Sequence, residues 1–212
     1  MYLPAHYEIN DADTLHGVIA KHPLGTWVVS NGNELIINHI PFLLDVTRGP
    51  HGTLIGHVAR ANSVWTQLDQ ASSSAVVFHA EQGYISPNWY PSKHQHHRVV
   101  PTWNYAVAHV HGKAQAIEDK NDLLKIVSAL THHQEARQEN PWRVSDAPSE
   151  HIDRLLGAIV GIEIEIDTLM GKFKLSQNQA PLDRQGAIAG LQDSGEAESI
   201  ALAELMKHVI DP

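Results

Sequence analysis

Three segments of the chain combine aromatic rings, amides, hydroxyls and isolated positive charges, at residues 56–62, 84–105 and 171–178. A phosphate group binds best to guanidinium, ammonium and hydroxyl donors. A flat ring system binds best to an aromatic wall with a few polar groups at its edge. The segments contain side chains of both kinds: the cations Arg60, Lys93 and Lys174, the hydroxyls Ser86, Thr102 and Ser176, and the amides Asn62, Asn104 and Gln177.

The same segments hold most of the aromatic side chains that could form such a wall. The rings within or beside them are Trp65, Trp89, Trp103, Tyr84, Tyr90 and Tyr105. Aromatic side chains in proline-bounded loops are costly to expose, so we expect them to line a cleft or an interface. The alternative interpretation is that the rings fill the core, the amides cap turns and the lysines are solvated.

Other kinds of site have weaker support. The chain has no cysteine, which excludes thiolate nucleophiles and cysteine-ligated metals. His94, His96 and His97 are clustered, and His109 and His111 share a strand face, but a solvated loop and a half-exposed strand explain both pairings, and we predict no metal site. No dinucleotide-binding glycine motif, P-loop, zinc-protease motif or hydrolase nucleophile motif occurs.

Length and charge limit the class of protein. A chain of 212 residues can bury a substantial core without disulfides. Its net charge of −9 argues against nucleic acid or an anionic membrane as the main partner. No signal peptide and no apolar run of roughly 20 residues is visible. We therefore expect a cytoplasmic protein that does not enter the membrane.

The elements that must position these side chains follow from hydrophobic periodicity and turn signals. Strands are expected at 26–30, 34–40, 42–46, 53–59, 75–80, 99–117 and 162–167, and helices at 11–22, 62–68, 121–137, 149–158 and 196–210. The Asn31-Gly32 turn joins the first two strands as an antiparallel hairpin. The pattern predicts one α+β domain over residues 1–212, with about six strands in an antiparallel barrel, helices packed outside it, and a C-terminal helix.

In these segments the chain resembles the PaiB-like family of FMN-binding negative transcriptional regulators. The likeness rests on residues 1–4, 56–62, 84–90, 100–105 and 172–178, in that order along the chain. The resemblance implies a mostly β fold with flanking helices. More closely, it implies a split antiparallel β-barrel of the FMN-binding and pyridoxamine-phosphate-oxidase type, with FMN in a cleft at a homodimer interface.

Carried over by motif, the resemblance implies a set of cofactor-binding residues and names no catalytic acid or base. The set is Arg60, Asn62, Ser86, Trp89, Tyr90, Lys93, Thr102, Trp103, Asn104, Lys174, Ser176 and Gln177. Within it we expect Arg60 and Lys174 to bind the phosphate and Trp89 or Trp103 to lie against the ring. The histidine-rich loop 93–98 departs from the family pattern and leaves a metal or haem open as an alternative.

Three functions remain open at this point. The first is a flavin-reductase-like oxidoreductase, for which a nicotinamide is a candidate electron donor. The second is a transcriptional regulator of the PaiB type, acting directly or through a partner, with flavin as sensor or structural ligand. The negative charge and the lack of a basic recognition helix argue against direct DNA binding. The third is an interaction scaffold whose flavin site has lost its use.

Overall fold

The computed structural model describes residues 1–32, 34–70 and 73–210. It divides the chain into two compact units. Unit 1 comprises Met1–Asp11, His79–Ala108 and Met170–Pro212, and unit 2 comprises Ala12–Phe78 and His109–Leu169. Strands β6 (Ser73–Ile85), β7 (Thr102–Ile117) and β8 (Ile159–Lys174) each contribute residues to both units. The expectation of a single domain stays a prediction.

The sheet has eight strands in the described part of the chain, in the order β3-β2-β6-β7-β8-β5-β4, with β1 paired to β8. The remaining strands are β1 (Glu8–Ile9), β2 (Leu24–Ser30), β3 (Leu35–Pro41), β4 (Leu43–Asp45) and β5 (Thr53–Ala59). The pairs with known register are antiparallel. The predicted antiparallel sheet with flanking helices is therefore confirmed. The eight strands exceed the expected barrel of about six. The seven strand segments expected along the chain correspond to β2–β8, and β1, with only two residues, has too little periodicity to be detected.

The core of unit 2 forms where the inward faces of its strands meet. Ile162, Ile164 and Ile166 on β8 are fully buried, whereas Glu165 between them is exposed, as the alternating sequence predicts. Trp27 on β2 is also fully buried, and its indole nitrogen donates to the Ser74 hydroxyl at 2.6 Å. Helix α1 (Ala12–Lys21) adds the buried side chains Leu15 and Ile19.

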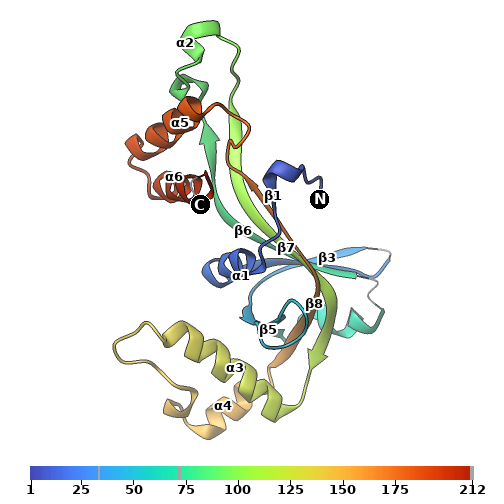
Figure 1. Ribbon diagram of the computed structural model, residues 1–212. Helices are drawn as coiled ribbons and strands as arrows, with labels where there is room; N and C mark the ends of the chain where they lie inside the picture. Colours follow the sequence, from blue (N-terminus) through green and yellow to red (C-terminus); the bar gives the residue numbers. More distant parts are fainter. Residues whose placement is uncertain (33, 71–72, 211–212) are drawn as a thin grey trace. The chain divides into compact units, whose positions relative to one another are not determined.

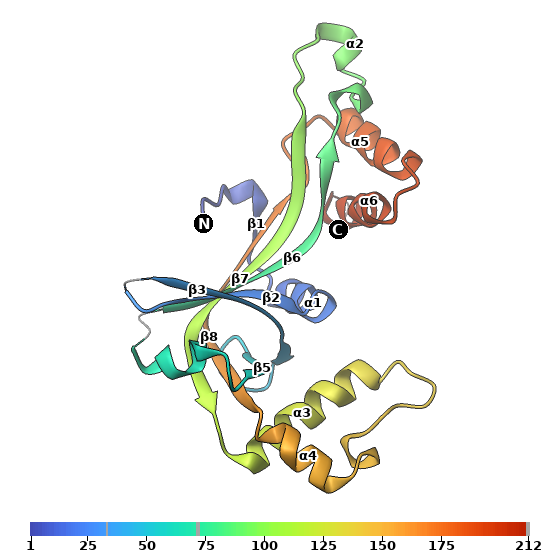
Figure 2. The same ribbon diagram turned by 180° about the vertical axis from the view of Figure 1, so that it is seen from behind.

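Helices α3 (Lys120–Glu135) and α4 (Ser149–Leu156) belong to the same unit and lie side by side (Figures 1 and 2). The Asp119 carboxylate caps α3 by accepting the backbone N–H groups of Asn121 and Asp122 at 2.9 and 3.1 Å. The buried face of α3 packs tightly on β8, because a Cβ at Gly161 would lie 2.7 Å from the Ile126 side chain. Two 3-10 helices, η2 (Ser63–Gln70) and η4 (Val144–Asp146), complete the unit.

Unit 1 contains residues 79–85 of β6, 102–108 of β7 and 170–174 of β8. It also contains helices that the periodicity predicted only in part. Helices α5 (Pro181–Asp193) and α6 (Ala197–Ile210) lie side by side in Figures 1 and 2. The shorter helices are η1 (Ala5–Tyr7), η3 (Pro87–Trp89) and α2 (Lys93–His96). The prediction of α6 is confirmed. Strand β6 extends to Ile85, five residues beyond the strand expected at 75–80.

Helix α5 was missed because two glycines interrupt its apolar pattern, and the structure gives their reason. A Cβ at Gly190 would lie 2.3 Å from ring atoms of Trp89, and one at Gly186 would lie 2.1 Å from the Trp89 carbonyl oxygen. The two glycines therefore make room for Trp89 and its loop on the surface of α5. In the parts of the chain that the structure covers, no helix is both long and apolar enough to cross a membrane.

We predict that Gly190→Ala destabilises the fold by about 1–3 kcal/mol, because the Trp89 ring must move to admit the methyl group. Gly17→Ala is the matched control, since Gly17 also lies inside a helix but has no atom within 4 Å of its missing Cβ. This control should be neutral or stabilising by up to about 1 kcal/mol, as helix propensity favours alanine. Urea unfolding of both variants tests the pair. Equal stabilities would contradict the packing of Trp89 on α5.

Candidate functional site

Lys174, at the end of β8 in unit 1, has a half-buried ammonium group that is held only by neutral oxygens. Its Nζ donates to the Trp103 carbonyl oxygen at 2.6 Å and to the Thr102 hydroxyl. Burial lowers the pKa of Lys174, and the positive charge of Lys172 lowers it further. Thr102, Trp103 and Lys174, three of the predicted site residues, are thus in direct contact.

Lys172 lies two residues earlier, on the same face of β8, and is only 9% exposed. Its Nζ donates to the Tyr2 carbonyl oxygen at 3.0 Å and lies 5.6 Å from the ring centres of both Tyr2 and Tyr105. Burial raises the pKa of the neighbouring Tyr7 hydroxyl, and Lys172 partly offsets this rise. Sequence reasoning missed Lys172, although the Lys-x-Lys spacing on a strand was a signal for it.

Among the described residues, neither Lys172 nor Lys174 forms an ion pair with a carboxylate. Two ammonium groups are therefore partly removed from water on one strand face without a counter-charge. Burial of uncompensated charge is unfavourable, and an anion that binds beside these lysines relieves that cost. The arrangement can bind a phosphate or a carboxylate.

Behind this pair, the predicted site residues Asn104 and Ser176 form a buried polar contact. The Asn104 Nδ2 donates to the Ser176 hydroxyl at 3.0 Å, and that hydroxyl lies 3.2 Å from the Asn104 Oδ1. Ser176 adopts φ of +64°, a left-handed conformation uncommon for a non-glycine residue. Gln177 holds the same turn, since its amide accepts from the Leu175 N–H at 2.7 Å and donates to the Phe173 carbonyl at 2.6 Å. These side chains fix the backbone that follows Lys174.

Tyr90 packs into the same interior and is 1% exposed. Burial raises the pKa of its hydroxyl, and the Ser176 hydroxyl partly offsets this rise. Within the described part of the chain, the Tyr90 hydroxyl has no hydrogen-bond partner of normal geometry. The predicted role of Tyr90 in cofactor binding stays a prediction, and its burial makes it part of the core of unit 1.

Exposed aromatic rings lie on β7, the neighbour of β8 in the sheet, and on β6, the strand beyond it. Trp103 on β7 is 49% exposed, and its indole nitrogen donates to the Gln82 side chain on β6 at 3.2 Å. Tyr84, two residues beyond Gln82 and therefore on the same face of β6, is 50% exposed. Trp89 is instead packed on α5. Of the two tryptophans expected against a flat ring, Trp103 has the accessible face.

In the loop after β6, the remaining predicted residues hold local structure. The Ser86 hydroxyl caps η3 by accepting the Asn88 N–H at 3.2 Å, and the Lys93 ammonium donates to the Asn88 side chain. The loop is also tied to α5, because the buried Asp183 carboxylate accepts the Ser92 N–H at 3.0 Å and the Ser92 hydroxyl at 2.6 Å. Sequence reasoning did not find this contact, which joins residues 91 positions apart.

The histidines that follow this loop, His94, His96 and His97, are exposed. No group of three or more histidine, aspartate or glutamate side chains in the described part of the chain is arranged to hold a metal ion.

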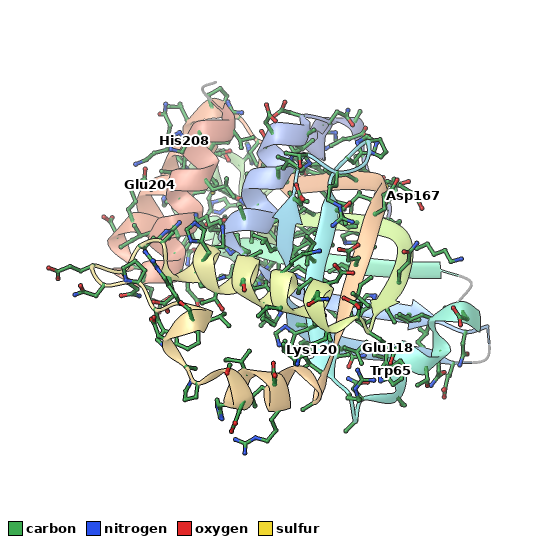
Figure 3. The ribbon with its side chains drawn as sticks, turned by 90° about the horizontal axis from the view of Figure 1, so that it is seen from below. Trp65, Glu118, Lys120, Asp167, Glu204 and His208 are labelled. Atoms are coloured by element: carbon green, nitrogen blue, oxygen red, sulfur yellow. The ribbon has the colours of Figure 1, made fainter. Side chains whose placement is uncertain are left out.

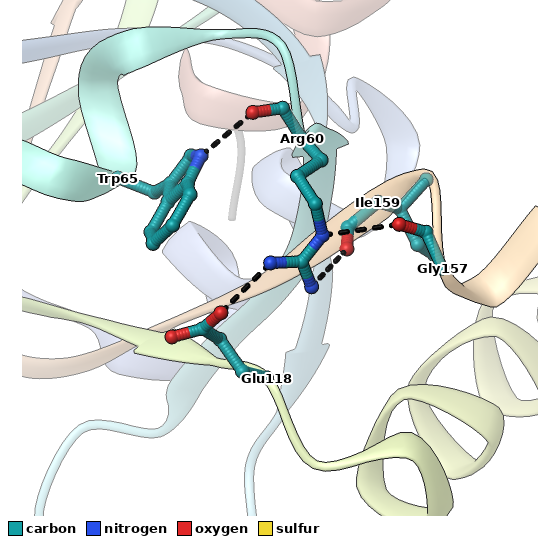
Figure 4. A network of polar contacts seen from close by, with 5 residues as sticks. All are labelled: Arg60, Trp65, Glu118, Gly157 and Ile159. Carbon is teal, nitrogen blue, oxygen red and sulfur yellow. Dashed lines mark hydrogen bonds and ion pairs between the residues drawn. The ribbon is translucent and has the colours of Figure 1, made fainter.

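In unit 2, the guanidinium group of Arg60 is occupied by the protein itself (Figure 4). Its Nη1 pairs with the Glu118 carboxylate at 2.7 Å. Its Nε donates to the Gly157 carbonyl at 3.0 Å, and its Nη2 donates to the Ile159 carbonyl at 3.1 Å. Arg60 thereby connects the end of β5 to the end of β7 and to the turn that precedes β8.

Trp65 and Asn62 strengthen this corner of unit 2. The Trp65 ring centre lies 5.5 Å from the Arg60 guanidinium carbon, and its indole nitrogen donates to the Arg60 carbonyl at 3.0 Å. The Asn62 side chain accepts the Val64 N–H at 3.0 Å and donates to the Asn38 side chain at 2.7 Å. Figure 3 shows Trp65 and Glu118 in the same region of this unit. The motif 56–62 thus supplies contacts within unit 2, whereas the lysines and Trp103 belong to unit 1.

Comparisons with known proteins place this geometry in context. Residues 1–168 match a sequence family described as "Putative FMN-binding domain". The chain is 28% identical over 207 residues to the protease synthase and sporulation protein PAI 2 of Bacillus subtilis, covering 98% of this chain and 97% of that protein. It is 32% identical over 243 residues to an uncharacterized protein of Emericella nidulans, with the same coverage of 98% and 97%.

Solved structures share the fold at low sequence identity. The FAD and heme binding protein from Mycobacterium smegmatis is 17% identical, with a TM-score of 0.59 over 87% of this chain and 80% of that chain. The flavocytochrome Anf3 from Azotobacter vinelandii is 12% identical, with a TM-score of 0.55 over 79% of this chain and 69% of that chain. Together with the strand order, these likenesses confirm the expected split-barrel fold. Because the family match spans residues 1–168 and the relatives match almost end to end, the chain belongs to the FMN-binding family that includes the PAI 2 protein.

Proposed function

We propose that this protein binds FMN and acts as a flavin-reductase-like oxidoreductase, with the phosphate of FMN bound at Lys174. The observation that carries the proposal is the ammonium group of Lys174, held by the Trp103 carbonyl and the Thr102 hydroxyl beside a second lysine, with no carboxylate partner in the described part of the chain. A phosphate would supply the missing negative charge, and Thr102 would add a hydroxyl donor.

Aromatic side chains on β7 and β6 also fit a planar ring. Trp103 and Tyr84 expose half of their surface on neighbouring strands, which is the wall that an isoalloxazine ring needs. The flavin supplies electron transfer when it is bound. The chain's own residues bind it, orient its ring against Trp103 and exclude water from one of its faces. The FMN-binding family match and the flavin-binding structural neighbours support the same cofactor class.

The proposal includes a homodimer with flavin at its interface, a nicotinamide as electron donor and a cytoplasmic location. Support for the dimer comes from β3, the last strand on one side of the sheet order, where Leu35 is 65% and Ile37 is 57% exposed. Exposed apolar side chains on an edge strand favour coverage by another chain.

Transcriptional regulation remains the second proposed function. Its support is the Bacillus subtilis relative named protease synthase and sporulation protein PAI 2. The net charge of −9 favours an effect through a partner or through flavin sensing over direct contact with DNA.

The function is tested by adding FMN to the purified protein and recording flavin absorption and fluorescence, and then NADH oxidation. We expect quenched flavin fluorescence and flavin-dependent NADH oxidation. Unchanged absorption and fluorescence of the added FMN would contradict FMN binding. Quenching of FMN fluorescence without oxidation of NADH or NADPH favours the regulatory function.

Lys174→Gln should weaken FMN binding by about tenfold or more, since a charge-assisted hydrogen bond to the phosphate is lost. Its affinity for riboflavin, which has no phosphate, should change little. Fluorescence titration with both flavins measures the ratio, and Lys125→Gln, an exposed lysine of unit 2, is the control. If Lys174→Gln weakens both flavins equally, Lys174 does not bind the phosphate.

FMN affinity should fall with rising pH at a value below the ordinary pKa of lysine. The pKa of Lys174 in the free protein is lowered by burial and by Lys172, so its ammonium loses its proton earlier than an exposed lysine. Binding of the phosphate is strongest below that pKa and weakens above it. The ratio of FMN to riboflavin affinity, measured across the alkaline range, removes the titration of the ring itself. In Lys174→Arg this ratio should stay constant across the alkaline range, because arginine keeps its charge. If the ratio in Lys174→Arg falls with pH as it does in the wild-type protein, the assignment is rejected.

Arg60 is expected to act on stability. Arg60→Ala should destabilise the protein by about 1–3 kcal/mol through loss of two carbonyl hydrogen bonds and the Trp65 contact. Glu118→Gln should cost less than about 1 kcal/mol, because that ion pair is largely exposed. Chemical unfolding measures both. If Arg60→Ala is stable but has lost its preference for FMN over riboflavin, Arg60 binds the phosphate.

A further inference from the structure

Helices α5 and α6 of unit 1 line a pocket that is open to solvent and shares no residue with the site around Lys174. It has a volume of about 300 Å³ and is lined by Pro181, Arg184, Gln185, Ile188, Ala189, Gln192 and Lys207. This volume is at the lower end of the range for ligand cavities, which begins at about 300 Å³. All of these residues lie beyond position 168, where the match to the FMN-binding family ends.

The two cationic side chains that line this cavity differ in whether the protein supplies them with a counter-charge. The Lys207 ammonium is neutralised by Glu204 at 2.7 Å, and Glu204 also accepts the Gln192 amide at 3.1 Å. Figure 3 shows Glu204 on α6, with His208 one turn further along. The Glu204 carboxylate therefore already has its cation, and the pKa of Glu204 is lowered by Lys207.

Arg184 has no such partner. Its Nε is buried without a hydrogen bond, and no ion pair in the described part of the chain includes its guanidinium group. The nearest carboxylate in sequence, Asp183, is occupied by Ser92 on the other side of α5. A buried donor on a charged group is costly to leave unpaired, so the cavity favours an anion that accepts from Arg184.

The remaining walls indicate which anion fits. Pro181, Ile188 and Ala189 offer an apolar surface, and Gln185 and Gln192 add polar side chains to the lining. One uncompensated guanidinium matches a single carboxylate, which it can bind through two parallel N–H donors. A phosphate dianion would need a second uncompensated cation, which Lys207 does not provide.

We propose that this cavity binds a small organic acid with one carboxylate and an apolar body, and that Arg184 binds the carboxylate. This site is independent of the proposed flavin site. It gives the protein a means to bind a second small molecule, a substrate or an effector, in the part of the chain outside the family match.

The proposal is tested on the full-length protein with benzoate as the probe, and with benzamide and inorganic phosphate as controls. Changes in the side-chain amide signals of Gln185 and Gln192 report binding by NMR. We expect benzoate to bind with a millimolar Kd and benzamide to bind at least about tenfold more weakly. Equal binding of benzoate and benzamide, tighter binding of phosphate, or no response to benzoate would each overturn the proposal.

Two variants locate the binding residue. Arg184→Gln should weaken benzoate binding about tenfold, whereas the exposed Arg137→Gln should not change it. Gln185→Glu covers the case in which Arg184→Gln fails to fold, because residue 185 is exposed and a carboxylate there would occupy Arg184 and exclude benzoate. Benzoate binding that survives both Arg184→Gln and Gln185→Glu would show that Arg184 is not its ligand. Both variants should keep their FMN affinity, which separates this site from the flavin proposal.

Discussion

The partial burial of two like charges on one strand face is the constraint on which the site of unit 1 depends. Lys172 and Lys174 lie two residues apart on β8, so their ammonium groups share a side of the sheet. Neutral groups hold both: carbonyl oxygens, a hydroxyl and the rings of Tyr2 and Tyr105. Such groups orient an ammonium without cancelling its charge. The surrounding structure thus keeps a positive potential where a phosphate can use it.

Arg60 shows the opposite use of a cation. Its guanidinium meets a carboxylate, two carbonyls and an aromatic ring within unit 2, so its charge and three of its nitrogens are satisfied by the protein. In the sequence, Arg60 was as good a candidate for binding phosphate as Lys174. The two differ in how many hydrogen-bond and charge partners the protein itself supplies. Arg60 uses its donors to connect three strand ends, whereas Lys174 can still bind an anionic ligand. The same criterion identifies Arg184 on α5, whose neighbour Lys207 is already paired.

Tryptophan follows a similar division. Trp89 and Trp103 both lie in motifs rich in proline and polar groups, and the sequence offered them as equivalent candidates for a ring wall. Trp89 occupies the surface that Gly186 and Gly190 leave on α5, and so it fixes that helix to the loop after β6. Trp103 makes one hydrogen bond to Gln82 and keeps half its surface exposed. Close packing uses one ring for structure and leaves the other available for a ligand.

The local pattern of the sequence was sufficient to predict the antiparallel strands, the Asn31-Gly32 hairpin, helices α1, α3, α4 and α6, and the three polar-aromatic segments, because periodicity and turn chemistry are properties of neighbouring residues. The family motifs extended this to the fold class and the flavin. Helix α5 could not be predicted, since its glycines are explained only by Trp89, about a hundred residues earlier. Lys172 was overlooked for the same kind of reason. Whether a cation is paired depends on groups brought together by folding, such as Tyr2 with Lys172 or Glu118 with Arg60. The sequence therefore determined which charged and aromatic side chains the protein has. Tertiary contacts decided which of them are bonded within the protein and which can contact a ligand.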